Sequence, residues 1–137
     1  MYLGLDFGTS SVKALLVDGA QRVLASASSP LAVSRPAPGH SEQDPWDWWQ
    51  AMLDAVGALR AREPAAFAAL RGIGLSGQMH GAVLLDAAGE VLRPCILWND
   101  TRSTAECREL EEAFPALHEV AGNLAMPGFT APKLLWV

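Results

Sequence analysis

The chain has 137 residues and a formal net charge of −5, and half of its residues are hydrophobic. This length suffices for one modest domain with a buried core. The acidic balance excludes a nucleic-acid scaffold, because no basic run is available to neutralise phosphates. The sequence has no signal-peptide leader at Met1 and no uninterrupted apolar stretch of about 18 residues, so we expect a cytoplasmic protein without a membrane partner.

Two stretches at the start are apolar and β-prone, Tyr2 to Phe7 and Val12 to Val17. They predict two strands joined by a turn over residues 8–11. Arg22 to Ser28 predicts a third strand, which makes an antiparallel meander. A dinucleotide-binding or Walker-type domain would place a helix after the first strand, so both classes are excluded.

The first turn is rich in small and hydroxylated residues and is a candidate phosphate cradle. Backbone N–H groups around Gly8 and Thr9 can point into one concavity, and the hydroxyls of Thr9, Ser10 and Ser11 add donors. Lys13 can supply a positive charge nearby.

Asp6 is a carboxylate near the end of an apolar strand. Its desolvation is costly unless it is paired, and Mg²⁺ or a water on Mg²⁺ is a suitable partner. The alternative is a plain hairpin in which Asp6 caps its own turn. Taken alone, the turn motif favours this alternative.

Helical signals follow an irregular segment. Asp44 as N-cap and Pro45 in the first turn predict a helix from about Pro45 to Arg62, and a short helix from Ala65 to Leu70 should follow. The tryptophans of the long helix are interpreted as core. Its expected buried face has helical spacing and consists of Trp49, Met52, Leu53, Val56 and Leu59.

Polar side chains follow two later strands. Met79 and His80 come after the strand Gly72 to Gly77, and Asn99 to Arg102 come after the strand Cys95 to Trp98. Ligands bind at the carboxyl ends of parallel strands, so these side chains are candidates for a ligand crevice. The alternatives are a loop histidine with a gap-filling methionine, and a surface pair of Asp100 with Arg102.

The remainder predicts small elements. Residues 82–92 suggest a hairpin, and Ser103 with Glu106 suggests a capping box opening a helix to about Phe114. A shorter helix from Pro115 should end at Gly122. Thr130 should cap a last helix that stops within about two turns, so we expect a fragment of a longer polypeptide. Cys95 and Cys107 lack zinc-site spacing and are expected to be reduced, without a function.

With these pieces in order, the sequence resembles the amino-terminal part of the FGGY carbohydrate kinases, and within them the xylulokinases. The similarity runs through the whole chain. Its motifs lie at residues 5–13, 34–36, 41–45, 77–81, 96–100, 122–124 and 126–136. Glycerol kinases carry an arginine and a glutamate where Met79 and His80 stand here, which favours xylulose as the sugar.

The resemblance implies an α/β fold, a partial ribonuclease-H-like (actin-like ATPase) domain. It opens with the antiparallel meander and continues with alternating helices and strands. Residues 1–137 would be the incomplete first kinase domain, with its remainder and the second domain absent. The implied activity is ATP-dependent phosphorylation of D-xylulose to D-xylulose 5-phosphate by the full-length protein. The fragment alone should be inactive, and exposed apolar surface would favour a homodimer.

The resemblance also implies residue roles. Asp6 would hold Mg²⁺, and Gly8, Thr9, Ser10 and Lys13 would face the phosphates of ATP. The sugar side would be formed by Met79, His80, Trp98, Asn99 and Asp100. The catalytic base is expected beyond residue 137. Competing interpretations are another FGGY sugar or polyol kinase, or a non-catalytic actin-like module that binds nucleotide.

Overall fold

The computed structural model describes all 137 residues, which divide into two compact units. Met1–Ala32 and Trp46–Gln78 form the first unit, and Val33–Pro45 and Met79–Val137 form the second. None of the helices combines the length and apolarity that crossing a bilayer requires.

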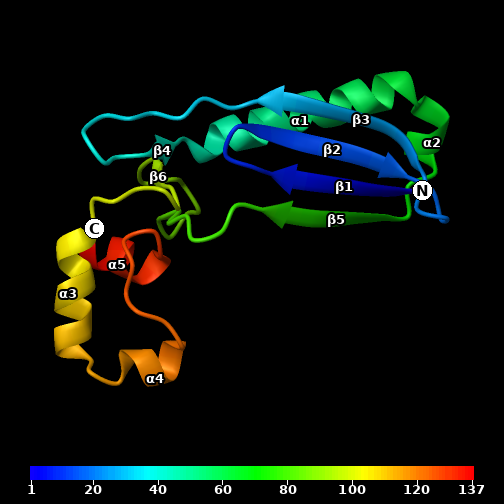
Figure 1. Ribbon diagram of the computed structural model, residues 1–137. Coiled ribbons are helices and arrows are strands. Elements are labelled where there is room, and N and C mark those ends of the chain that lie inside the picture. The colour runs from blue at the N-terminus through cyan, green and yellow to red at the C-terminus, as the bar shows by residue number, and fades with distance from the viewer. The chain divides into compact units, whose positions relative to one another are not determined.

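The first unit contains a four-stranded mixed sheet in the order β3-β2-β1-β5 (Figure 1). β1 (Tyr2–Phe7) pairs antiparallel with β2 (Ser11–Val17), which pairs antiparallel with β3 (Val23–Pro30). The predicted meander is therefore confirmed, although its third strand begins one residue later and ends two residues later. β5 (Gly72–Gly77) has the predicted bounds and runs parallel to β1.

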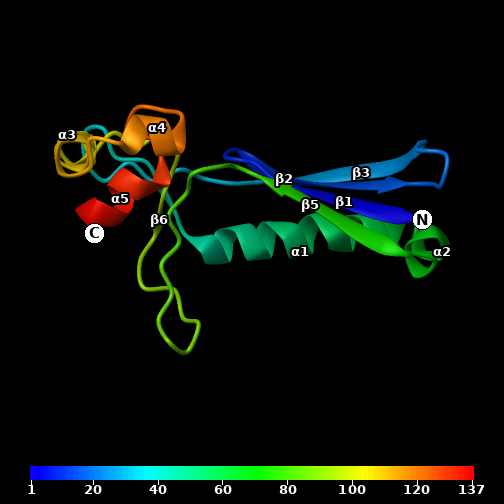
Figure 2. The same cartoon turned by 90° about the horizontal axis from the view of Figure 1, so that it is seen from below.

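The core of the first unit lies between this sheet and α1 (Pro45–Arg62), which covers one face (Figure 2). The short α2 (Pro64–Ala68) follows and adds Ala66 and Phe67 to the edge of this core. Inward residues alternate along the strands, as expected for a sheet with one covered face. The buried core residues are Leu3, Leu5, Ala14, Leu16, Ala25, Ala55 and Leu59.

The bounds of α1 are as predicted, but its predicted buried face is wrong in part. The buried residues are Ala51, Ala55 and Leu59, spaced four residues apart. Trp49 and Leu53 lie two positions from Ala51, about 200° around a helix with 3.6 residues per turn. Their side chains are consequently 54% and 46% exposed. Small alanines line the sheet-facing stripe, so hydrophobicity alone marked the wrong side.

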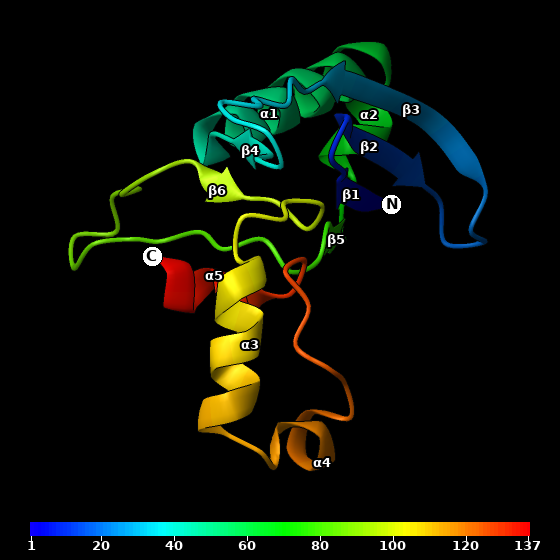
Figure 3. The same ribbon diagram turned by 60° about the vertical axis from the view of Figure 1, so that its left-hand side comes forward.

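The second unit has little regular structure. β4 (Glu42–Gln43) and β6 (Cys95–Ile96) form a two-residue antiparallel pair. Three helices follow, α3 (Thr104–Ala113), α4 (Leu117–Ala121) and α5 (Thr130–Trp136), and α3 lies beside α5 (Figure 3). The predicted hairpin over residues 82–92 forms as a short pairing around one bridge, between Leu85 and Val91. The N–H groups of Asp86 and Leu92 donate to the Glu90 and Leu84 carbonyls, each at 2.9 Å.

Two predicted helix caps are wrong. Ser103 precedes α3, but its side chain does not cap the helix, and its hydroxyl donates to the Pro127 carbonyl at 3.3 Å. Thr130 lies within α5, and Phe129 occupies the N-cap. Gly122 does end α4 in a left-handed conformation, as predicted. The Ser103 hydroxyl therefore bonds a carbonyl that is distant in the sequence in place of capping its own helix. Residue spacing along the chain could not reveal this partner.

Candidate functional site

Three polar side chains lie in one row across the sheet of the first unit. Asp6 in β1 pairs with Lys13 in β2 and with Ser76 in β5. Paired residues on neighbouring strands point to the same face, so the three side chains share the face opposite the buried leucines. They line a pocket of about 360 Å³ whose other lining residues are apolar or glycine: Gly4, Leu5, Leu15, Gly74 and Leu75. The pocket thus places a carboxylate, an amine and a hydroxyl together.

Ser76 holds the candidate metal ligand. Its hydroxyl donates to Oδ1 of Asp6 at 2.6 Å. A carboxylate has lone pairs for about four partners, so Asp6 retains capacity for a cation or its water. Sequence reasoning missed Ser76. The signal that could have found it is strand pairing, because a parallel strand 72–77 beside strand 2–7 places residue 76 opposite residue 6.

The turn between β1 and β2 is closed by its own hydrogen bonds. The Gly8 N–H donates to the Ser11 carbonyl at 3.1 Å. The cradle hypothesis requires this N–H to point at a phosphate, and in this structure it is not available. A Cβ at Gly8 would lie 3.1 Å from that carbonyl, which explains the glycine. Thr9 Oγ1 lies 3.1 Å from Gln78 Oε1, its acceptor, and Ser10 is exposed. The Ser10 hydroxyl and Lys13 remain candidate phosphate contacts, and the Thr9 hydroxyl can donate to a phosphate only if it leaves Gln78.

We predict that Ser76→Ala lowers kcat about tenfold, because the hydrogen bond that orients Asp6 is lost while the carboxylate remains. The variant should fold normally, since Ser76 is exposed. The measurement is steady-state kinetics of the whole protein, with Ser28→Ala on β3 as an exposed control. Unchanged kcat in Ser76→Ala would show that this bond does not position Asp6 for the reaction.

The arrangement of acidic side chains shows which mode of Mg²⁺ binding the residues present could support. No group of three or more His, Cys, Asp or Glu side chains is arranged to hold a cation. Mg²⁺ is commonly bound through one or two carboxylates together with substrate phosphates and waters. The single carboxylate of Asp6, oriented by Ser76 and facing a pocket, fits that mode. It does not resemble a dedicated protein cage.

The second unit has its own pocket, of about 290 Å³. Four of the five predicted sugar-side residues line it, and Met79 does not, with a side chain 58% exposed. The side-chain oxygen of Asn99 is buried and has no hydrogen-bond partner. Buried acceptors normally find a donor, so this oxygen suits a ligand hydroxyl. The lining residues are His80, Trp98, Asn99, Asp100, Thr101, Met126, Pro127, Gly128 and Phe129.

His80 adopts an uncommon backbone conformation for a residue with a side chain. Its φ is +63°, in the left-handed region. The imidazole lies against Phe129, with ring centroids 4.7 Å apart and planes tilted by 52°. His80 is exposed overall, so its ring can reach a ligand in the pocket. Strain of this kind persists only where surrounding contacts hold it.

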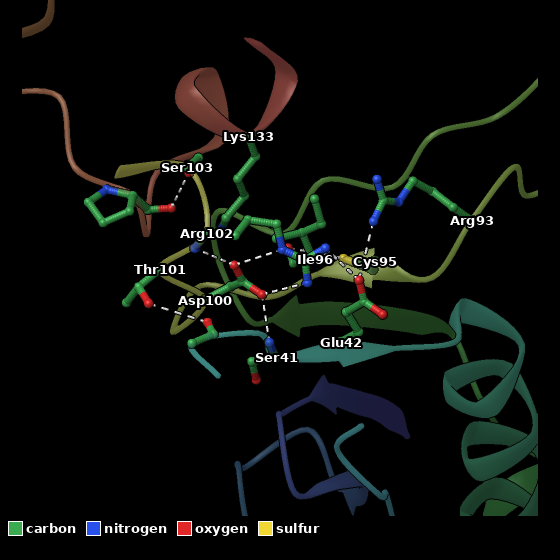
Figure 4. Close-up of polar contacts among 12 residues, drawn as sticks. Ser41, Glu42, Arg93, Cys95, Ile96, Asp100, Thr101, Arg102, Ser103 and Lys133 are labelled. Atoms are coloured by element: carbon green, nitrogen blue, oxygen red, sulfur yellow. Dashed lines mark hydrogen bonds and ion pairs between the residues drawn. The ribbon is translucent and has the colours of Figure 1, made fainter. Parts of the chain in front are cut away.

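Asp100 is a buried structural carboxylate, with 1% exposure. It accepts hydrogen bonds from the Ser41 N–H at 2.6 Å and from Arg102 through its N–H, Nε and Nη2 (Figure 4). Burial would raise the pKa of Asp100, but the hydrogen bonds from Arg102 and Ser41 hold it below the usual value. Four donors occupy the hydrogen-bonding positions of the carboxylate. Asp100 therefore supports the pocket, and its carboxylate does not contact a ligand.

The expected surface pair of Asp100 and Arg102 is therefore a buried pair, since the Arg102 side chain is 3% exposed. Its guanidinium also bonds Glu42 at 2.7 Å, and Arg93 reaches the same carboxylate at 3.2 Å. Both guanidinium carbons lie over the Trp136 ring, at 5.0 Å for Arg93 and 4.9 Å for Arg102. This ionic network links β4, the segment after β6, and α5.

Both cysteines are free, as expected, and both are buried. Burial raises the pKa of Cys95 to about 11, so its thiol is protonated near neutral pH. Neither cysteine belongs to a candidate catalytic group.

The family model described as "FGGY family of carbohydrate kinases, N-terminal domain" matches residues 1–137. The chain belongs to this family. Xylulose kinase from Klebsiella pneumoniae is 53% identical over all 137 residues, which span 28% of that protein. A crystal structure of a xyloylose kinase from Brucella ovis superposes with a TM-score of 0.96 and 62% identity, over 99% of this chain and 28% of that one.

A xylulose kinase structure from Rhodospirillum rubrum matches 98% of this chain and 28% of its own, with a TM-score of 0.91 and 35% identity. These neighbours confirm the expected α/β fold, a ribonuclease-H-like (actin-like) domain present in part. The chain spans little more than a quarter of the length of the relatives it matches.

Proposed function

We propose that the protein containing this chain transfers the γ-phosphoryl group of ATP to D-xylulose, giving D-xylulose 5-phosphate. The observation that carries the proposal is the 53% identity, over the full 137 residues, to a xylulose kinase. The chain would form the opening part of the first kinase domain. The base that deprotonates the attacking hydroxyl is proposed to lie outside these residues.

The first unit supplies the phosphate side in this proposal. Phosphoryl transfer depends mainly on positioning and on neutralising charge. Asp6 would hold Mg²⁺ directly or through water, and the bound ion would supply positive charge near the phosphates. Ser10 offers its hydroxyl to a phosphate oxygen, and Thr9 does the same once its hydroxyl turns from Gln78 to the phosphate. Gly8 lets the backbone approach closely. Lys13, which pairs with Asp6 across the strands, adds a positive charge.

The second unit supplies the sugar side. His80 exchanges hydrogen bonds with sugar hydroxyls, and the unpaired Asn99 oxygen accepts one from a further hydroxyl. Trp98 gives the pocket an apolar wall, and Met79 shapes its approach. Asp100 acts through the backbone that it holds, because its own oxygens are occupied. His80 and Asn99 serve two of the hydroxyls of a polyhydroxylated substrate, and Trp98 packs against its carbon skeleton.

We predict that His80→Ala raises the KM for xylulose about tenfold, because at least one hydrogen bond to the sugar is lost. The KM for ATP should stay within about twofold of wild type. His118→Ala on exposed α4 is the matched control. Equal xylulose KM values in the two variants would remove His80 from the sugar site.

A substrate panel tests the choice of sugar. Xylulose should have the highest kcat/KM among ketoses, polyols and sugar acids. A polyol or a sugar acid as the preferred substrate would instead indicate a different member of the family. Nucleotide binding without any sugar turnover would favour a non-catalytic actin-like module.

A further inference from the structure

Lys133 in α5 is the largest of the fully buried side chains, with 0% exposure. Its Nζ donates to the carbonyls of His80 and Gly128, each at 2.8 Å. Neither acceptor is a carboxylate, so backbone dipoles bind the ammonium directly, and the nearby Asp100 carboxylate also favours its charged form. Burial lowers the pKa of Lys133, which reflects the cost of removing this charge from water.

The two carbonyls belong to separate loops that both line the pocket of the second unit. One is the loop of His80, whose left-handed backbone needs support. The other is the loop 126–129, which carries the Phe129 ring against the imidazole. Because a single ammonium bonds both loops, it fixes their separation and therefore the position of His80 in the pocket.

The segment that carries Trp98 and Asn99 also lines the pocket, and it packs closely against Gly128. A Cβ at Gly128 would lie 2.5 Å from the Trp98 carbonyl, so the two backbones are in direct contact there. Lys133, Gly128 and Trp98 thus form a chain of contacts from α5 to the segment that carries Asn99. Lys133 does not itself line the pocket.

We propose that Lys133 is a positioning residue for the sugar pocket, which clamps the His80 loop to the Gly128 loop from behind. The inference rests on the proposed function for the identity of the ligand. A buried charge is a costly way to anchor a short helix, since a well-packed apolar side chain serves stability as well or better. A directional clamp on two carbonyls explains why an ammonium occupies this site.

The test compares Lys133→Met with wild type in the whole protein. Methionine keeps the length and fills the space but leaves both carbonyls without a donor. The xylulose KM should rise about tenfold or more, because small misplacements of binding groups have large effects. The KM for ATP should not change. Cys107→Ala, a buried change on α3 outside the pocket, should lower the melting temperature without changing either KM.

A direct readout follows the imidazole itself. The NMR signals of His80 should shift or broaden in Lys133→Met, while those of His118 remain in place, and His80→Ala assigns the signals. Lys133→Arg is the second variant if Lys133→Met does not fold. It keeps the charge and several donors but moves them, so it should raise the xylulose KM as well.

The two proposals fail separately. If the wild-type protein prefers another sugar or a polyol, the proposed function is wrong, and the KM for that substrate then tests Lys133. Soluble Lys133 variants with a wild-type substrate KM and unshifted His80 signals would overturn the positioning role. A loss confined to kcat and melting temperature would also overturn it, because it would indicate a structural anchor only.

Discussion

Asp6→Asn is expected to lower kcat of the whole protein by at least about a hundredfold, the scale seen when one preorganised electrostatic contact to a transition state is removed. The amide keeps the shape of the carboxylate and can still accept the Ser76 hydrogen bond. What it loses is the charge that would hold Mg²⁺ near the phosphates. Steady-state kinetics at saturating ATP and sugar measure the effect, and the KM for sugar should change little.

Asp54→Asn provides the matched control for this prediction. Asp54 is an exposed carboxylate on α1 of the same unit, and its partners are Gln50 and Ser29. It should retain wild-type kcat. Titrating Mg²⁺ adds a second readout, since Asp6→Asn should require more metal for half-maximal rate. A wild-type kcat in Asp6→Asn would exclude the metal role.

Asp100→Ala is expected to destabilise the protein by about 3–5 kcal/mol, the usual cost of removing one partner from a buried ion pair. Arg102 would remain buried with part of its charge uncompensated. The N–H groups of Ser41 and Arg102 would lose their acceptor as well. Calorimetry measures the fall in melting temperature. Hydrogen exchange at these two amides should accelerate in the same variant.

Asp86→Ala is the control for Asp100→Ala. Asp86 also accepts two backbone N–H groups, from Ala88 and Glu90, but it lies on an exposed turn. Its replacement should cost about 1 kcal/mol or less. Similar losses of stability in the two variants would mean that burial of the pair of Asp100 and Arg102 adds nothing to its contribution.

The Asp100 contribution also has a defined pH dependence. The folded-state pKa of Asp100 lies below its ordinary value of about 3.9. Its stabilising contribution is therefore complete above that value and is lost as pH falls through the folded pKa. The difference in melting temperature between wild type and Asp100→Asn should be constant near neutrality and should narrow below about pH 4. A difference that widens in acid would contradict this assignment.

Local signals were sufficient for the three-stranded meander and for the bounds of the long helix. The alternation of Val12, Ala14 and Leu16 predicts a strand with one buried face, and all three are buried. Pro45 opens α1 and Pro64 follows its end at Arg62, as helix-boundary rules predict. These features depend on residues within a few positions of one another, so the sequence contains the information directly.

Other features depend on contacts between distant residues. Ser76 reaches Asp6 across 70 positions, and Asp100 reaches Ser41 across 59. Lys133 finds its carbonyl partner at His80 across 53 positions. Composition near each residue suggested a surface pair, a helix start or a strand end. Only the folded chain reveals that Asp100 is buried with its carboxylate fully hydrogen-bonded, and that Lys133 lies behind the pocket.

The measurement that tests the central proposal most directly is the identity of the phosphorylated product. Purified whole protein is incubated with xylulose and ATP labelled in its γ-phosphoryl group, and the product is analysed by ³¹P NMR. The account predicts label on the terminal hydroxyl of xylulose, with ADP formed in equal amount. Release of inorganic phosphate without a sugar phosphate, or label on a different sugar only, would contradict it.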